Sequence, residues 1–263
     1  FGAAFLFVVG LYDDLRSVKP VLKLVSQMLA LLGMVYFYHD AIERFRLHTI
    51  FEFISADLFN VLVFCFFLVL INAVNLMDGI DGLAALVSIN FFSVMAIIFF
   101  RSNHHHFSIL SLVIIGSLMA FLFFNFSRKF KIFMGDCGSL FIGSIMAFLI
   151  FYLLDSESAL VTDNLISRPL LTVLLLLYPL IDTLRAFLIR AYNNKSPFVA
   201  DRVHLHHRLA DKGYQHWQAS VLTFSLSTFI LVVNVLLFST IGLLGGVALT
   251  VVLLTVFYYT FFK

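Results

Sequence analysis

The sequence predicts an all-α protein, a polytopic bundle of membrane-spanning helices. Hydrophobic residues make up 62% of its 263 residues and charged residues only 12%, against about half and a quarter in a typical soluble domain. The apolar residues gather in runs close to the 17–25 residues that cross a bilayer as a helix. The 33 phenylalanines are more than a soluble domain of this length could bury. We expect one integral membrane domain over residues 1–263.

Taken in order, the apolar runs predict about nine spans, each with boundaries good to a few residues. They cover residues 1–12, 21–38, 58–74, 82–100, 107–126, 140–154, 169–189, 219–238 and 241–262. Because the chain starts at Phe1 inside an apolar run, we read it as N-terminally truncated. Residues 44–53 alternate polar and apolar side chains, which favours a short external strand or hairpin. The two cysteines, Cys65 and Cys137, suggest no disulfide framework.

Lysine and arginine are unevenly divided between the two sides that alternating loops define. Thirteen of the 17 fall on one side, and only Arg44, Arg46, Arg101 and Arg168 fall on the other. Basic residues concentrate in cytoplasmic loops of membrane proteins. The basic side is therefore expected to face the cytoplasm.

Four polar clusters stand out, and all four fall on the predicted cytoplasmic side. The most unusual is Asn72–Gly82, where Asp78 and Asp81 lie three residues apart within an apolar region. The others are Asp13-Asp14, Phe133–Ser139 around Asp136, and the loop Arg190–Trp217 with His204-Leu-His-His207. Each alone could be an ordinary polar turn or helix end. Charges beside hydrocarbon are costly, so together they indicate a functional site.

Clustered acids with interspersed basic residues suggest a metal ion and a phosphorylated substrate. Magnesium is favoured, with Mn²⁺ as the alternative, because hard cations take oxygen ligands and share them with phosphates. The three histidines could instead bind zinc, but no cysteine is near and Arg202 and Arg208 flank them, which favours a phosphate-facing role. Asp182 could pair with Arg185 or reach the site. Lys23 could be an interfacial lysine or a site residue.

The four motifs, in this order, resemble the polyprenyl-phosphate N-acetylhexosamine-1-phosphate transferases of the glycosyltransferase family 4 type. The resemblance is carried by Gly10-Leu-Tyr-Asp-Asp-Leu15, Asn72–Ala84, Phe133–Gly143 and Ser196–His207. The muramoyl-pentapeptide branch has three consecutive histidines followed by Phe. His204-Leu-His-His207 is instead similar to the undecaprenyl-phosphate N-acetylglucosamine-1-phosphate transferase branch. Members carry about two further helices before the first motif, which implies about eleven spans in a complete protein.

The resemblance implies that UDP-N-acetylhexosamine and undecaprenyl phosphate react to give undecaprenyl-diphospho-N-acetylhexosamine and UMP. The sugar would be N-acetylglucosamine, in the first membrane step of a cell-envelope polysaccharide such as O-antigen or a teichoic-acid linkage unit. The enzyme would be a Mg²⁺-dependent, multi-pass protein of the bacterial inner (plasma) membrane. Its partners would be both substrates and membrane lipid, without nucleic acid, and a homodimer is left open.

The same resemblance implies roles for individual residues. Asp136 would be the main magnesium ligand, with Asp78. Catalytic roles fall on Asp13, Asp14, Asp78, Asp81, His204, His206 and His207. Substrate contacts fall on Lys23, Asn75, Phe133, Arg190 and Arg202. Direct attack by the lipid phosphate and a covalent phospho-aspartyl route both stay open.

Three rival readings are weaker. An ion-coupled transporter with an acidic cytoplasmic-side site would usually place that site near mid-bilayer between repeats, and no repeat is visible. A CDP-alcohol phosphotransferase needs an Ala-Arg pair after Asp-Gly, which Asp78–Ala85 lacks. A scaffold would not need four polar motifs on one side.

Overall fold

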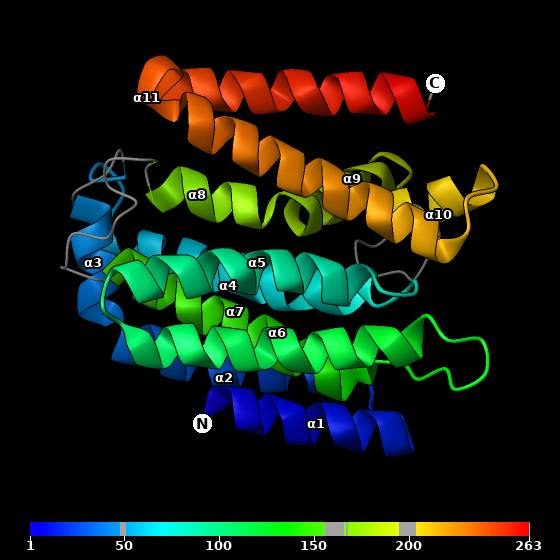
Figure 1. The fold of residues 1–263 in the computed structure, drawn as a ribbon. Coiled ribbons are helices and arrows are strands. Elements are labelled where there is room, and N and C mark those ends of the chain that lie inside the picture. Colours follow the sequence, from blue (N-terminus) through cyan, green and yellow to red (C-terminus); the bar gives the residue numbers. More distant parts are fainter. Residues whose placement is uncertain (48–50, 156–165, 167, 195–203, 263) are drawn as a thin grey trace. The chain divides into compact units, whose positions relative to one another are not determined.

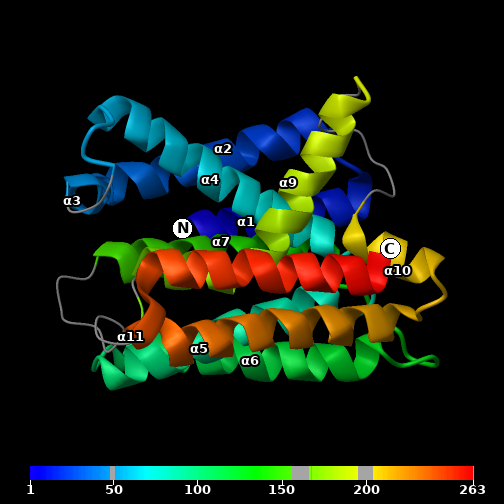
Figure 2. The same cartoon turned by 90° about the horizontal axis from the view of Figure 1, so that it is seen from above.

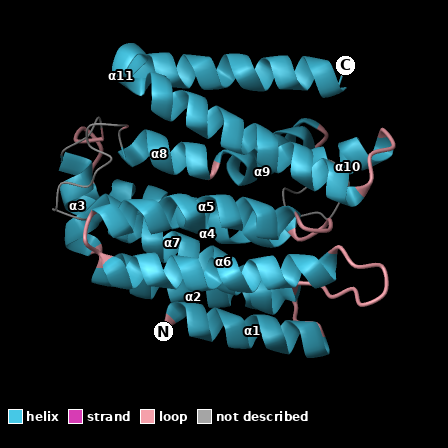
Figure 3. Ribbon diagram, in the orientation of Figure 1, coloured by secondary structure: helices cyan, strands magenta, loops and turns pink. Residues whose placement is uncertain are grey.

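A computed structural model describes residues 1–47, 51–155, 166, 168–194 and 204–262. Every regular element in these ranges is a helix and none is a strand (Figure 3). The all-α polytopic fold that the composition predicts is confirmed. The chain divides into two compact units, residues 1–78 with 132–159 and residues 79–131 with 160–263. Each unit is described by itself.

The first unit consists of helices α1 (Gly2–Arg16), α2 (Pro20–Phe37), α3 (His39–Leu47), α4 (Ala56–Met77) and α7 (Gly135–Asp155). Its centre is α7, which packs against α1, α3 and α4. An α-helix that is apolar on all sides is normally buried. In α7, 67% of the residues in its most apolar 18-residue stretch are buried. The rings of Phe67 on α4 and Phe151 on α7 stack with centroids 4.0 Å apart.

The second unit consists of α5 (Leu83–Arg101), α6 (His105–Asn125), α8 (Arg168–Leu175), α9 (Leu177–Tyr192), α10 (Leu205–Asp211) and α11 (His216–Phe262). Helix α5 is its most buried span and packs against α6 and α11. The hydroxyl of Ser108 on α6 donates a hydrogen bond of 2.9 Å to the carbonyl of Ala96 on α5. Helices α8 and α9 form one apolar stretch bent by 68°.

Helix α11 contains a reversal of the chain at Gly242. This residue has φ 64° and ψ −168°, a conformation that glycine adopts readily and other residues avoid. The two arms of α11 run side by side (Figures 1 and 2), and the Asn234 amide donates to the Thr250 hydroxyl across them at 3.1 Å. The arms correspond to the predicted spans 219–238 and 241–262.

Among the described residues, six helices are long and apolar enough to cross a membrane, or seven if the bent pair α8–α9 is one span. The sequence predicts about nine. The difference has two sources: α1 has only 15 residues, and α11 counts once although it has two arms. Each of the nine predicted apolar runs is nonetheless mainly helical in the structure.

The predicted strand or hairpin at residues 44–53 is wrong. The described part is the end of α3 followed by a turn. Ala41, Ile42 and Phe45 lie on one face of this helix, where Ala41 and Ile42 are buried and the ring of Phe45 packs on that of Phe59. The segment up to Leu47 is a short amphipathic helix, and its polar and apolar residues happen to alternate over the few positions that suggested a strand.

Candidate functional site

The first unit brings α1 directly onto the first turn of α7. A Cβ atom added to Gly10 would lie 2.5 Å from Cα of Cys137 and 2.6 Å from the carbonyl carbon and oxygen of Asp136. Only a residue without a side chain allows this backbone-to-backbone contact. Because Asp13 and Asp14 follow Gly10 by about one turn, the contact carries both carboxylates to the start of α7.

Carboxylates from two other helices cap the start of α7. Asp14 accepts hydrogen bonds from the backbone N–H groups of Asp136 (2.9 Å) and Cys137 (3.1 Å). Asp78, at the end of α4, accepts one from the N–H of Gly135 (3.1 Å). The first N–H groups of a helix lack partners within the helix and attract negative charge. Asp14 and Asp78 therefore fix the position of α7 relative to α1 and α4.

Asp13 and Asp136 face a common cation, the ammonium group of Lys23 on α2. Lys23 Nζ lies 3.1 Å from Asp13 Oδ2 and also forms an ion pair with Asp136. Burial alone would raise the pKa of the Asp13 carboxyl, but hydrogen bonds donated by the Val18 N–H and by Lys23 outweigh this and hold the pKa below its ordinary value. Asp13 is therefore an anion at neutral pH.

Asn75, on α4, orients the carboxylate of Asp136. Its amide nitrogen donates to Asp136 Oδ1 at 2.9 Å and to Ser139 Oγ at 2.8 Å. Ser139 donates in turn to the Gly135 carbonyl. Phe133, predicted to stack on uridine, is 72% exposed just before α7.

Asp13, Asp14 and Asp136 offer oxygen atoms that all lie within 4.8 Å of one another. In the part of the chain that the structure describes, this is the only group of three or more acidic, histidine or cysteine side chains that could hold a metal ion. The predicted ligand Asp136 belongs to it. The other predicted ligand, Asp78, instead accepts the Gly135 N–H group.

In the second unit, Asp81 has its own set of partners. Its carboxylate lies 2.7 Å from Lys131 Nζ and 3.6 Å from His216 Nδ1, and its carbonyl accepts a hydrogen bond from Ser220 Oγ at 2.6 Å. The sequence singled out Asp81, but not Lys131, His216 or Ser220. These three residues tie the Asp81 turn to the segment before α7 and to the start of α11.

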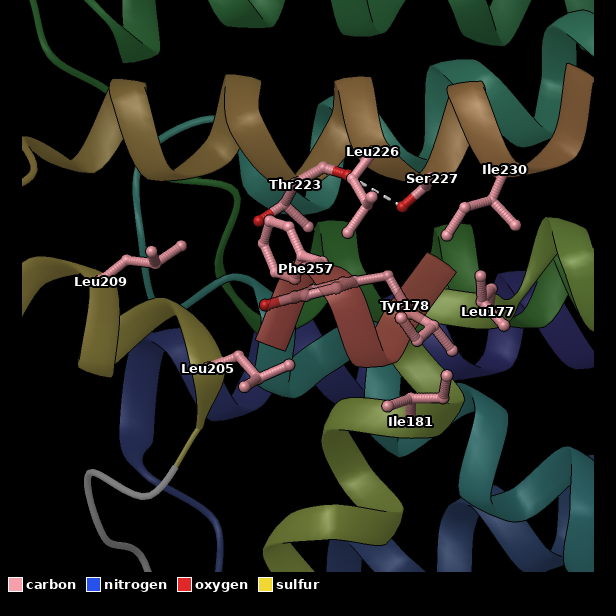
Figure 4. A pocket seen from close by; sticks show the side chains of 11 residues that line it. Leu177, Tyr178, Ile181, Leu205, Leu209, Thr223, Leu226, Ser227, Ile230 and Phe257 are labelled. Atoms are coloured by element: carbon pink, nitrogen blue, oxygen red, sulfur yellow. Dashed lines mark hydrogen bonds between the residues drawn. The ribbon is translucent and has the colours of Figure 1, made fainter. Parts of the chain in front are cut away.

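A second group in the same unit contains Asp182 and Arg190 of α9 and His204, the residue before α10. All three are buried, with 3%, 3% and 4% of their surface exposed. The predicted Arg202 and the side chains of His206 and His207 lie outside the described residues. An apolar pocket lies between α9, α10 and α11 (Figure 4), lined among others by Tyr178, Leu205 and Phe257.

The structure therefore places Asp13, Asp14, Lys23, Asn75, Asp78 and Asp136 together in the first unit. Sequence reasoning gave no role to Gly10 or Ser139. Both lie inside motifs that it quoted, one turn from an acidic residue. The signal that could have found them is a small residue on the acidic face of an otherwise bulky apolar helix.

A family model for glycosyl transferase family 4 matches residues 1–154. A Bacillus subtilis protein described as a probable undecaprenyl-phosphate N-acetylglucosaminyl 1-phosphate transferase is 39% identical over 160 residues, 60% of this chain and 42% of that protein. A Mycolicibacterium smegmatis decaprenyl-phosphate N-acetylglucosaminephosphotransferase is 33% identical, with 59% and 41% covered. A Latilactobacillus sakei phospho-N-acetylmuramoyl-pentapeptide-transferase is 41% identical over 120 residues, with 45% and 37% covered.

The chain spans about two fifths of the length of these relatives. The matched residues 1–154 include α1, α2, α4 and nearly all of α7, and therefore every carboxylate of the acidic group in the first unit. The chain belongs to glycosyl transferase family 4.

Proposed function

We propose that the protein transfers N-acetylhexosamine 1-phosphate from a UDP-sugar to undecaprenyl phosphate, giving undecaprenyl-diphospho-sugar and UMP. An oxygen of the lipid phosphate forms a new bond to the sugar-linked phosphorus. The bond from that phosphorus to the bridging oxygen breaks, and UMP leaves with the electron pair. Phosphoryl transfer of this kind depends mainly on positioning and on neutralising charge.

The observation that carries the proposal is the acidic group of Asp13, Asp14 and Asp136 with the Lys23 ammonium against it. It lies at the ends of apolar helices, where a lipid phosphate at the membrane surface and a soluble nucleotide could meet. Membership of the family supports transfer chemistry and disfavours the rival reading of an ion-coupled transporter.

The donor set fits a magnesium ion. Three carboxylates offer oxygen atoms within 4.8 Å, and oxygen is the ligand that Mg²⁺ prefers. Asp13 and Asp136 already point at a cation, Lys23, which shows that their oxygens converge. Asp136 would hold the ion, with Asp13 as the second ligand, and Asp78 would support the ligands through the start of α7. When bound, Mg²⁺ would neutralise the diphosphate oxygens.

Hydrogen bonding distinguishes the two adjacent aspartates. Both oxygens of Asp14 accept backbone N–H groups of α7, so Asp14 holds the helix in place. Asp13 contacts Lys23 and is the carboxylate better placed to position the lipid phosphate. Lys23 would bind phosphate oxygens, and Asn75 would keep Asp136 oriented.

We propose N-acetylglucosamine as the sugar, because two of the relatives above carry that sugar in their names and because of the His204-Leu-His-His207 motif. His206, His207 and Arg202 would contact phosphate groups of the donor. The basic loops favour a protein of the bacterial inner membrane with its site on the cytoplasmic side.

The test is thin-layer chromatography of lipid products formed by the intact purified protein with undecaprenyl phosphate, Mg²⁺ and radiolabelled UDP-sugars. UDP-N-acetylglucosamine should give a labelled lipid and one equivalent of UMP, whereas UDP-glucose and UDP-MurNAc-pentapeptide should not. Product from UDP-MurNAc-pentapeptide alone would move the protein to the other branch. If no UDP-sugar gave a labelled lipid, the proposed reaction would be wrong.

A further inference from the structure

Helix α10 begins one residue after His204, and the carboxylate of Asp182 holds this junction from the neighbouring helix α9. Asp182 Oδ1 accepts the backbone N–H of Leu205 at 2.7 Å. Asp182 Oδ2 lies 2.9 Å from His204 Nδ1. Each oxygen of this buried carboxylate therefore contacts one of two adjacent residues, His204 and Leu205, which lie 22 and 23 positions further along the chain.

The third member of the group decides which nitrogen of His204 carries the proton. Arg190 Nη2 lies 3.4 Å from His204 Nε2. A guanidinium group can only donate hydrogen bonds, so Nε2 must be an acceptor. The proton then lies on Nδ1 and is donated to Asp182. In histidine, the partner of one ring nitrogen generally fixes the state of the other.

Burial makes this order of donors and acceptors costly to break. Asp182, Arg190 and His204 are each at least 96% buried, and a buried polar group without a partner costs about 1–3 kcal/mol. The contacts of Leu205 and Leu209 give no such direction, because these side chains line the apolar pocket shared with α9 and α11 (Figure 4). Apolar contacts are non-directional.

We infer that Asp182 is a positioning residue, which locks His204 as the Nδ1–H tautomer against Arg190 and thereby sets the start of α10. His206 and His207 lie in the first turn of α10, so Asp182 sets the backbone that presents them. His204 itself is an internal link in this arrangement and not a base open to substrate. The inference rests on the proposed function for its effect on rate, but not for its effect on His204.

The inference is tested on the intact protein with ¹⁵N-labelled histidine, using His204→Gln to assign the signal. His204 should show a protonated Nδ1 and an unprotonated Nε2. In Asp182→Asn, one of the two acceptor oxygens becomes an NH2 donor, which must face either His204 Nδ1–H or the Leu205 N–H, so the tautomer should switch or the ring should lose its fixed environment. A wild-type His204 protonated at Nε2 would overturn the inference, whether or not the protein is active and whether or not the variant folds.

The second readout is turnover with UDP-N-acetylglucosamine. At metal sites, losing the carboxylate that orients a histidine costs about 10–100-fold, and we expect a loss of kcat in this range for Asp182→Asn, together with a lower melting temperature because a buried polar group loses its partner. Asp211→Asn, an exposed aspartate at the end of α10, is the matched control and should keep wild-type turnover. If Asp182→Asn kept wild-type kcat in an active protein, the positioning role would be refuted. An inactive wild type with the expected tautomer would count against the proposed function alone.

Discussion

Replacing Gly10 by alanine adds one methyl group where α1 meets α7, and the structure predicts that this methyl disables the acidic group. The added Cβ would lie 2.5 Å from Cα of Cys137, whereas ordinary contact begins at 3.4 Å, so the helices must separate by about 0.9 Å. The obstructing atoms are backbone and cannot rotate away. The Asp14 hydrogen bonds of 2.9 and 3.1 Å would lengthen by up to this amount, beyond hydrogen-bond range.

The expected cost has two parts. Forcing an extra methyl group into a packed interface costs about 1–3 kcal/mol, and we expect the upper end because only backbone can yield. A displacement of about 1 Å among catalytic groups can cost about 10²-fold in rate. Gly10→Ala should therefore unfold at a clearly lower temperature in detergent and release UMP about a hundredfold more slowly.

Gly33→Ala is the matched control. Gly33 lies in α2 of the same unit, and a Cβ there meets nothing within 4 Å. Both substitutions gain the same helix propensity, about 1 kcal/mol, so their difference isolates the contact with α7. Gly33→Ala should match or exceed wild-type stability and keep full activity. If the two variants behaved alike, the close approach of α1 and α7 would be refuted.

Three further changes test other contacts, each by melting temperature in detergent. Asp14→Ala removes two capping bonds at the start of α7 and should cost about 1–2 kcal/mol; an unchanged melting temperature would contradict the capping role. Gly82→Ala should destabilise the second unit by about 1 kcal/mol or more, since Gly82 has φ 77° and its Cβ would fall 2.2 Å from the ring of Phe126; a stabilised variant would refute this. Asn234→Leu breaks the bond to Thr250 between the arms of α11 and should cost about 0.6 kcal/mol; a gain in stability would contradict it.

Hydropathy alone predicts most of the helices, because in a bilayer an apolar run must satisfy its backbone within one helix. It fails where length and pattern stop being decisive. The alternation at residues 44–53 resembles a strand, but the residues up to Leu47 belong to α3, where the ring of Phe45 packs against those of Phe51 and Phe59. The bend between α8 and α9 lies at Leu176, three residues before Pro179. A proline inside a helix removes a backbone hydrogen bond and kinks the helix, a signal that hydropathy alone does not use.

The residues of the candidate site could be predicted better than their arrangement. Motif spacing selected Asp13, Asp14 and Asp136, which the structure brings within reach of one another. Motif spacing could not assign different roles to Asp13 and Asp14. Their roles depend on which of the two carboxylates accepts the N–H groups of a helix more than 120 positions away. Likewise, a motif shows that His204 is polar, but only the fold shows that Asp182 and Arg190 bury it.

The most direct test of the central claim, that the acidic group of α1 and α7 is the reaction centre, is the rate of undecaprenyl-diphospho-N-acetylglucosamine formation as Mg²⁺ is titrated. It should be measured for the intact protein and for Asp136→Asn and Asp57→Asn. Asp57 is an exposed aspartate in the first turn of α4, about 30 Å along that helix from Asp78. The account predicts no lipid product from Asp136→Asn at any Mg²⁺ concentration and wild-type rates from Asp57→Asn. Wild-type turnover by Asp136→Asn, or its loss in Asp57→Asn alone, would contradict it.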